Sequence, residues 1–383
     1  MNKNILIVAS MGSMIAQFNM NNINILLSKG YKIHVACNLS EIDPMSEEKR
    51  KKLIRFFEKN NIVYYHIDFP RGIGSIYKNF EVYKQLKKIF KNNEYQFIHT
   101  HSPLASIFSR IFALFHSIPI IYTAHGFQFF KNGPKKDWLI FFPIEYIFSI
   151  FTDLVITINN EDYQLAKKMK FKKVEYVPGV GIDYKKIQES KLISRISRKD
   201  LGLSKEDVVL LSVGELSNRK NHEVVIQAIE KLPNNIKYLI CGTGELNEYL
   251  QELVTKKNLD NRVTLLGYRT DVYDIMNISD IFVFPSKREG LGLAAIEAMA
   301  SGLPLITSNI NGINDYSQQG YTGYLCNPTD IDQFTEYIKV LSENENFRYD
   351  FSRNNVQLSK KYDLKNVDIK MSKIYSSFIG EHL

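Results

Sequence analysis

Cysteine is scarce in this sequence, and the three cysteines lie far apart. Cys37, Cys241 and Cys326 form no C-x-x-C pair within the 383 residues. This spacing excludes a disulfide framework and a structural zinc site of the usual kind. We therefore expect a protein of a reducing compartment.

Long apolar segments are also missing. The longest, Trp138–Phe151, contains Pro143 and Glu145 and is shorter than the roughly 20 apolar residues that span a bilayer. The N-terminal residues lead directly into a strand-like segment, Ile5–Ala9, without the apolar core and cleavage site of a signal peptide. The sequence predicts a cytoplasmic protein without a transmembrane helix.

Two motifs for cofactor and metal binding are absent or incomplete. Ser10–Ser13 carries one glycine, and Cys241–Asn247 lacks the third glycine of G-x-G-x-x-G, so a dinucleotide-dependent oxidoreductase is only a remote alternative. Asp330 and Asp332 form a D-x-D pair, but Asp330 stands at an expected helix start, where aspartate is a common cap. We predict no metal site and no cofactor.

The surplus of positive charge has no nucleic-acid-binding module beside it. Lys and Arg number 49 against 41 Asp and Glu, which gives a net charge of +8, and the basic residues are dispersed. We therefore expect no nucleic-acid partner. Lys131, Lys135 and Lys136 precede the apolar segment Trp138–Phe151, which suits either a core helix over a sheet or a helix on the inner face of the cell membrane.

The composition is that of a folded chain with more than one domain. Hydrophobic residues make up 44% and charged residues 23%, which excludes a disordered or low-complexity protein. A chain of 383 residues is long for one core, and a prior of roughly 150 residues per domain predicts two domains with a cleft between them.

Short apolar segments alternate with helix-length amphipathic segments almost throughout the chain. This alternation is typical of parallel βα units in doubly wound sheets, so we predict an α/β fold of two facing Rossmann-like domains. The expected strands lie near 5–9, 31–37, 63–69, 96–101, 119–124, 153–158, 173–178, 208–213, 236–241, 263–267, 281–285 and 304–308.

One break in the alternation marks a domain boundary. After Pro178–Gly181, a polar and basic segment precedes the next strand. We predict an N-terminal domain over 1–180, rejoined by a C-terminal helix at 365–383, then a hinge at 181–205 and a C-terminal domain over 206–364. Ligands of doubly wound sheets bind at the carboxyl ends of the strands, so we expect the chemistry in the cleft.

The most informative segment runs from Pro285 to Pro304. A strand leads into a turn with Gly290 and Gly292, and a helix rich in small residues follows, whose first N–H groups can hold a phosphate. Glu289 precedes this helix, and Glu297 lies eight positions later, which helical periodicity places on nearly the same face. Carboxylates beside a phosphate suit sugar hydroxyls, which together indicate a nucleotide sugar.

This segment resembles the E-x7-E signature of the retaining family 4 glycosyltransferases of the GT-B fold. Glu289-Gly290, Gly292-Leu293 and Glu297-Ala298-Met299-Ala300 are in register with it, and the resemblance extends over essentially the whole chain. It implies that Glu289 contacts the donor sugar and that Glu297 binds the ribose. The implied donor-binding residues of this segment are Glu289, Gly290, Leu291, Gly292, Leu293 and Glu297.

A second basic segment, Gly214–His222, follows the first strand of the C-terminal domain. Arg219 and Lys220 can neutralise a diphosphate without a metal ion. The resemblance implies this role for Lys220. The family usually has an arginine where this chain has Glu215, and we expect Arg219 to compensate.

Strand ends of the N-terminal domain supply further candidates. Gly12 and Ser13 follow the first strand, where the resemblance places the reacting centre, although an ordinary βα turn is the alternative. His101 and His125 also end strands. His125 resembles the family's histidine beside the transferred sugar and is a catalytic candidate with Lys220 and Glu289, whereas His101 is an acceptor-side candidate. A hydrogen-bonded histidine at a strand end is the alternative for both.

Gly242, Tyr268 and Arg269 end two strands of the C-terminal domain, where the resemblance places the nucleobase pocket. The predicted function is transfer of a sugar from a nucleotide sugar, a UDP-sugar by expectation, to a lipid-linked or oligosaccharide acceptor with retention of configuration, in the synthesis of a surface polysaccharide. A non-catalytic scaffold that binds nucleotide sugars is the alternative, motivated by Glu215.

Overall fold

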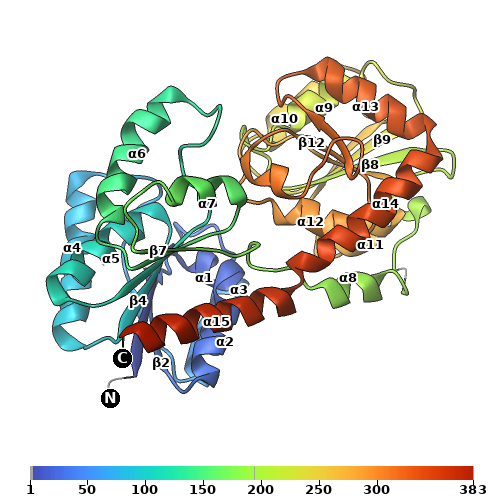
Figure 1. Ribbon diagram of the computed structural model, residues 1–383. Coiled ribbons are helices and arrows are strands. Elements are labelled where there is room, and N and C mark those ends of the chain that lie inside the picture. The colour runs from blue at the N-terminus through green and yellow to red at the C-terminus, as the bar shows by residue number, and fades with distance from the viewer. Residues whose placement is uncertain (1–2, 194, 383) are drawn as a thin grey trace. The chain divides into compact units, whose positions relative to one another are not determined.

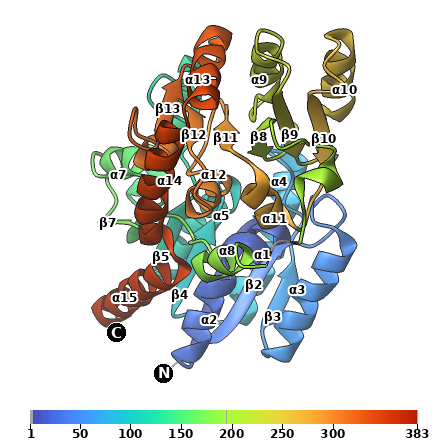
Figure 2. The ribbon, with the colours of Figure 1, turned by 90° about the vertical axis from the view of Figure 1, so that its right-hand side faces the viewer.

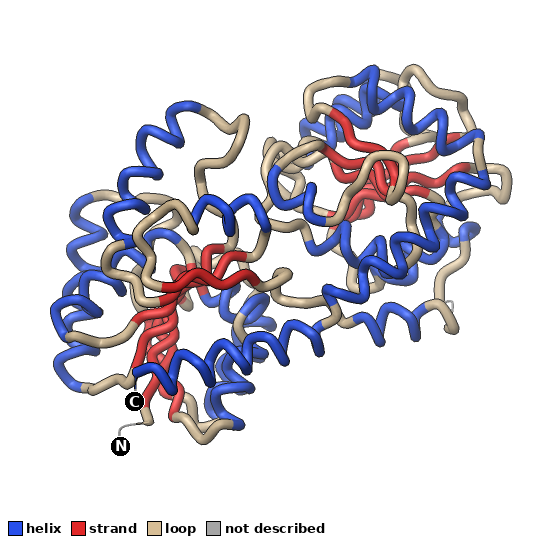
Figure 3. Tube along the Cα trace, viewed as in Figure 1, coloured by secondary structure: helices blue, strands red, loops and turns tan. Residues whose placement is uncertain are grey.

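The computed structural model describes residues 3–193 and 195–382. Contacts within this part of the chain divide it into two units, which are Met1–Val180 with Val367–Leu383, and Gly181–Asn366. Each unit contains a sheet with helices packed around it (Figure 3). The first unit is therefore discontinuous in the sequence, and the second is a continuous segment.

The first unit is built on a parallel sheet. Its strands within the described residues are β1 (Asn4–Met11), β2 (Lys32–Asn38), β3 (Val63–His66), β4 (Phe97–His101), β5 (Ile120–Ala124), β6 (Leu154–Thr157) and β7 (Lys173–Tyr176). Their order is β3-β2-β1-β4-β5-β6-β7, and all neighbours pair in parallel. The order reverses between β1 and β4, which makes this pair the switch point of a doubly wound sheet.

Helices cover both faces of this sheet because successive strand residues point to opposite faces. Ile5 and Ile7 pack with one group of helices, and Leu6 and Val8 pack with another. The first group is α1 (Gly12–Phe18), α2 (Met20–Ser28), α3 (Glu47–Lys59) and α15 (Leu364–His382). The second group is α4 (Ile76–Asn92) and α5 (Pro103–His116), and the unit also contains α6 (Lys135–Ser149) and α7 (Asn160–Ala166).

The second unit repeats the doubly wound pattern. Over the described residues its strands are β8 (Val208–Val213), β9 (Ile236–Cys241), β10 (Val263–Gly267), β11 (Ile281–Phe284), β12 (Leu305–Ser308) and β13 (Gly323–Cys326). Their order is β10-β9-β8-β11-β12-β13, as Figure 2 shows, with the switch point between β8 and β11. The helices are α8 (Tyr184–Ser190), α9 (His222–Ile229), α10 (Asn247–Lys256), α11 (Val272–Ile278), α12 (Leu293–Ala300), α13 (Ile331–Glu343) and α14 (Glu345–Ser359).

The prediction of an α/β fold with two doubly wound parallel sheets is confirmed. Each expected strand is present within a few residues of its expected bounds. The edge strand β13, which pairs with β12, was missed. It has four residues and begins at a glycine, so neither its length nor its composition distinguishes it from a loop.

The segment 181–205, for which we expect a hinge, lies in the second unit. Its helix α8 is tied to neighbouring helices by side-chain hydrogen bonds. The amide of Gln188 donates to the carbonyl of Ala300 at 2.7 Å, and the amide of Asn277 donates to Ser190 Oγ at 3.1 Å. Most of α15 instead belongs to the first unit and lies against its sheet (Figure 1).

Helix α6 is apolar on its outer face as well as its inner face. The carboxylate of Glu145 forms an ion pair with the buried Arg110 of α5 at 2.8 Å. The Arg110 guanidinium lies 4.2 Å from the ring centre of Tyr122. This buried contact fixes the rotation of the helix. The exposed apolar side chains of α6 and the two residues after it are Leu139, Ile140, Ile144, Ile147, Ile150 and Phe151. A core helix, one of the two alternatives for this segment, accounts for the buried inner face of α6 but not for its exposed apolar side chains.

No helix within residues 3–193 and 195–382 combines the length and apolar character required to span a bilayer. Helix α6 contains Pro143 in its interior and ends at Ser149, and β6 begins at Leu154. Its exposed apolar residues therefore need an explanation other than a transmembrane segment.

We expect the C-terminal helix to stabilise the first unit through its buried aromatic side chains. Phe378 is 1% exposed and packs in the hydrophobic core of the first unit. Replacing it by alanine should lower the free energy of unfolding, measured by urea titration, by about 3–5 kcal/mol. Ile369, on the same helix and 56% exposed, provides the matched control, since its replacement by alanine should cost less than about 1 kcal/mol. Equal losses in the two variants would contradict this assignment.

Candidate functional site

The loops after β8 and β11 lie side by side at the switch point of the second sheet. The two strands pair in parallel, with Ile281 opposite Leu210, so both loops leave the same edge. The backbone N–H of Lys287 donates to the carbonyl of Arg219 at 2.8 Å. Sheet topology thus brings together residues that are 68 positions apart.

A buried carboxylate with two cations lies between these loops. Glu289 Oε1 accepts hydrogen bonds from Lys220 Nζ at 2.6 Å and from an Arg219 guanidinium nitrogen at 2.8 Å. The side chains of Glu289 and Lys220 are 8% and 11% exposed, whereas that of Arg219 is 40% exposed. We call Arg219, Lys220 and Glu289 the Glu289 cluster. It brings together three residues that the sequence analysis selected separately.

The charges in the Glu289 cluster depend on one another. Burial raises the pKa of Glu289, but the positive charges of Lys220 and Arg219 outweigh it, and the pKa is lowered overall. Burial lowers the pKa of Lys220, and Glu289 opposes that effect. Glu215, which stands at the usual arginine position, is 60% exposed and 3.9 Å from Arg219. Arg219 lies beside Lys220 because both side chains contact Glu289 Oε1, and its compensating role stays a prediction.

Two asparagines hold the loops of the cluster in place. The backbone N–H of Glu289 donates to Asn311 Oδ1 at 3.2 Å. The amide of Asn221 donates to the carbonyls of Pro285 and Pro328 at 3.0 and 2.8 Å, and Asn221 has a φ of +60°, which asparagine tolerates better than most residues. Neither asparagine could be predicted, because nothing in a single sequence distinguishes them from ordinary loop residues.

The turn between Glu289 and α12 requires glycine at one position. Gly292 has a φ of +86°, and a Cβ there would lie 2.6 Å from the ring of Phe284. Gly290 and the buried Leu291 complete the turn, and Leu293 is the first residue of α12.

Glu297 lies in a different environment from Glu289. It sits within α12, and its carboxylate accepts a hydrogen bond from the hydroxyl of Tyr273, on α11, at 2.8 Å. Burial raises the pKa of Glu297. The periodicity argument for a shared face was wrong, because α12 begins at Leu293 and residues before it are not helical. Tyr273 is a candidate that the sequence analysis missed, since a tyrosine in the first turn of a helix is unexceptional.

The other nucleobase-side candidates have structural partners. A Cβ at Gly242 would lie 1.8 Å from the carbonyl oxygen of Gly214, so close backbone packing requires glycine there. Arg269 forms two hydrogen bonds with Asp271, at 2.8 and 2.6 Å, and Tyr268 is 61% exposed. These residues end adjacent strands β9 and β10 at the same edge as the Glu289 cluster.

In the first unit, Gly12 and Ser13 open α1 at the end of β1. The backbone N–H of Ser13 donates to the carboxylate of Asp43 at 2.7 Å, and a Cβ at Gly12 would lie 3.1 Å from that carboxylate. A carboxylate of the chain therefore contacts the helix start, which agrees with the ordinary βα turn, and the donor-binding role of these two residues stays a prediction.

His101 and His125 meet at the ends of the adjacent strands β4 and β5. His101 Nδ1 lies 3.1 Å from His125 Nε2. A third histidine, His99, contacts the hydroxyls of Tyr375 and Thr123, both at 2.8 Å. Burial lowers the pKa of all three, to about 4 for His125, so they are neutral at pH 7. The sequence analysis selected His101 and His125 but did not predict their contact.

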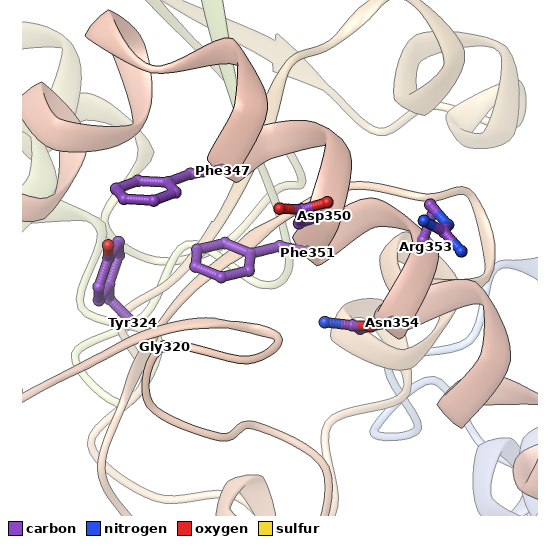
Figure 4. Close-up of a pocket in the computed structure, with 7 residues that line it drawn as sticks. All are labelled: Gly320, Tyr324, Phe347, Asp350, Phe351, Arg353 and Asn354. Carbon is purple, nitrogen blue, oxygen red and sulfur yellow. The ribbon is translucent and has the colours of Figure 1, made fainter.

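A cavity of about 540 Å³ lies elsewhere in the second unit (Figure 4). It is lined by Gly320, Tyr324, Phe347, Asp350, Phe351, Arg353 and Asn354. None of the predicted site residues is among them, so this cavity is separate from the Glu289 cluster. Across the part of the chain that the structure describes, no three or more His, Cys, Asp or Glu side chains are arranged to hold a metal ion.

Two family patterns match consecutive parts of the chain. The pattern described as Glycosyltransferase Family 4 matches residues 20–183, and that described as Glycosyl transferases group 1 matches residues 194–357. The second match includes the Glu289 cluster, and the first includes the histidines. Each match therefore includes one of the two groups of candidate residues.

Individual proteins resemble the chain over most of its length. An Escherichia coli UDP-Gal:alpha-D-GlcNAc-diphosphoundecaprenol alpha-1,3-galactosyltransferase is 34% identical, over 71% of this chain and 72% of that protein. The capsular polysaccharide biosynthesis glycosyltransferase CapM of Staphylococcus aureus is 24% identical, over 79% and 84%. The crystal structure of Anabaena Alr3699/HepE in complex with UDP and glucose has a TM-score of 0.77 at 19% identity, covering 98% of this chain and all of that one, which shows a shared fold.

The buried histidines predict a loss of stability in mild acid. Burial lowers the pKa of His125 and of His222 to about 4, against an ordinary 6.5, so the unfolded chain binds more protons than the folded chain between these values. Their stabilising effect is complete above about pH 6.5 and decreases as the pH falls toward 4. Urea midpoints should therefore decrease from pH 7 to pH 4.5, and less steeply in His222→Gln. A flat or rising profile would contradict this prediction.

Proposed function

Because the chain belongs to the family 4 glycosyltransferases, we propose that it transfers a sugar from a UDP-sugar to a lipid-linked or oligosaccharide acceptor during the synthesis of a surface polysaccharide. The observation that carries this proposal is the Glu289 cluster, which presents two cations and a carboxylate at the switch point of the second sheet. The name of the E. coli relative supports the choice of a UDP-sugar and a lipid-linked acceptor, and that of the S. aureus relative supports a surface polysaccharide.

The cluster suits the diphosphate and the sugar of such a donor. Lys220 and Arg219 share one carboxylate, so the Glu289 cluster keeps a net positive charge that can hold a diphosphate. The N–H groups at Gly292 and Leu293 would extend this contact to phosphate oxygens. Glu289 would then be available to accept a hydrogen bond from a hydroxyl of the donor sugar.

Glu297 would bind the ribose of the nucleotide. Its carboxylate accepts one hydrogen bond, from Tyr273, and can accept others from ribose hydroxyls. Gly242, Tyr268 and Arg269 lie at the same edge of the sheet and are our candidates for the nucleobase side. We place the acceptor on the first unit, with His101 and His125.

The reaction would retain the anomeric configuration and require no metal ion. The bond between the anomeric carbon and the diphosphate breaks, a bond to the acceptor oxygen forms on the same face, and the acceptor proton passes to the departing diphosphate. Lys220 and Arg219 would stabilise the charge that the diphosphate gains, as preorganised cations do in many active sites. An inverted product in an NMR assay would refute the stereochemical part.

Replacing Lys220 by alanine tests the function directly. We expect Lys220→Ala to lower kcat/KM for the nucleotide sugar roughly 100-fold, because a preorganised charge at the leaving group is lost. Lys287→Ala is the matched control, since Lys287 is an exposed lysine of the loop after β11. Transfer is measured with a panel of UDP-sugars, and thermal shifts report binding. Binding without turnover would instead favour the scaffold, and equal rates in the two variants would refute the role of Lys220.

We also propose that the outer face of α6 rests on an anionic membrane surface, where a lipid-linked acceptor would be found. A surface helix normally presents polar side chains to water, but the exposed face of α6 is apolar. Lys131, Lys135 and Lys136 are exposed at and before its first turn, where Asp137 and Glu161 are the neighbouring acidic residues. An apolar face with basic residues at one end suits an interface with anionic lipids.

Vesicle flotation tests this attachment. The double variant Leu139→Gln and Ile147→Gln, at positions 77% and 54% exposed, should bind vesicles containing phosphatidylglycerol about tenfold more weakly than the unaltered chain. The control replaces Leu192 and Ile369, which are 84% and 56% exposed elsewhere, by glutamine. Equal binding of both double variants, or equal binding to neutral vesicles, would refute the proposal.

A further inference from the structure

The contact between His101 and His125 has two possible hydrogen arrangements. His101 Nδ1 and His125 Nε2 are 3.1 Å apart, and burial lowers the pKa of both rings, so each carries one proton at pH 7. A hydrogen bond between two neutral imidazoles has an N–H on one side and a bare nitrogen on the other. Either His101 donates to His125, or His125 donates to His101.

The other nitrogen of His101 decides between these arrangements. His101 is fully buried, and its Nε2 has no hydrogen-bond partner among the described residues. If His125 donated, the proton of His101 would sit on Nε2 as a buried N–H without an acceptor, an arrangement that folded proteins rarely contain. If His101 donates through Nδ1, its N–H is satisfied and only a bare nitrogen is left at Nε2.

We infer that His101 is a positioning residue that fixes His125 as the tautomer with its proton on Nδ1. A bare Nε2 on His125, accepting from His101, requires the single proton of the neutral ring to be on Nδ1. His125 then offers a hydrogen-bond donor to its surroundings, and no basic nitrogen is left for removing a proton. The tautomer itself does not depend on the proposed function. Its consequence does: in sugar transfer, His125 would bind an oxygen of the substrates and would not act as a general base.

The surroundings of His101 keep its ring in place. His99, held by Tyr375 and Thr123, lies with its ring centre 4.2 Å from that of His101. The next residue, Ser102, has a φ of +67°, and its hydroxyl contacts that of Ser10 at 2.7 Å. A non-glycine residue in this conformation costs free energy, so it indicates that the surrounding contacts determine the position of the strand end. A ring held in this way can select a tautomer of its neighbour.

The tautomer can be read directly, without an activity measurement. In a two-bond ¹H–¹⁵N correlation spectrum of histidine-labelled protein at pH 7, a bare ring nitrogen and an N–H nitrogen resonate in separate regions. We expect Nε2 of His125 to be bare and Nδ1 to carry the proton, with the signals assigned by their loss in His125→Gln. A bare Nδ1 on His125 would overturn the inference, even if the chain transfers sugar.

Two variants test the positioning role. Asparagine can place its amide N–H close to where Nδ1 of histidine lies, whereas leucine cannot donate. We expect His101→Leu to lower kcat roughly tenfold to a hundredfold with little change in KM for the nucleotide sugar, and His101→Asn to recover much of that loss. Equal losses in both variants would overturn the inference. Absence of transfer by the unaltered chain would refute the proposed function alone, since the spectrum still decides the tautomer.

Discussion

A buried carboxylate needs a positive charge beside it, and this requirement organises the second unit. Glu289 is nearly inaccessible to water, and an unpaired charge in such a place would cost several kcal/mol. The loop that follows β8 supplies Lys220 and Arg219, and Asn221 fastens that loop to the chain on either side of β12. The position of every group in the cluster therefore depends on the pairing of β8 with β11.

The fold could be predicted because strands buried on both faces form short apolar segments that alternate with helix-length amphipathic segments along the sequence. Residues at strand ends could also be predicted, since parallel strands direct their carboxyl ends to one edge. Lys220, Glu289, His101 and His125 were selected as candidates from such positions and, for three of them, from the family resemblance. The prediction failed where local backbone geometry decides. Periodicity was applied across Gly292, although a left-handed residue there places the helix start after Glu289.

Contacts between side chains distant in the sequence could not be predicted. Tyr273 meets Glu297 because α11 and α12 lie together, and Asp43 meets Ser13 because a loop passes over the start of α1. Neither pair has a spacing or composition that a single sequence reveals. The orientation of α6 could not be predicted either. Its apolar residues are evident in the sequence, but the buried contact of Glu145 with Arg110 determines which of them face water.

The chain leaves the first unit after residue 180 and returns to it at residue 367, so the two units are completed in the reverse of the order in which they begin. The second unit is continuous, and its ends are joined by backbone hydrogen bonds of Ile182 with Tyr362 and of Leu364 with Ile182. It contains all its own strands once residue 366 has left the ribosome. The first unit is begun earlier but lacks α15, whose Tyr375 and Phe378 complete its core, until the last described residues emerge. The domain made first is therefore the one finished last.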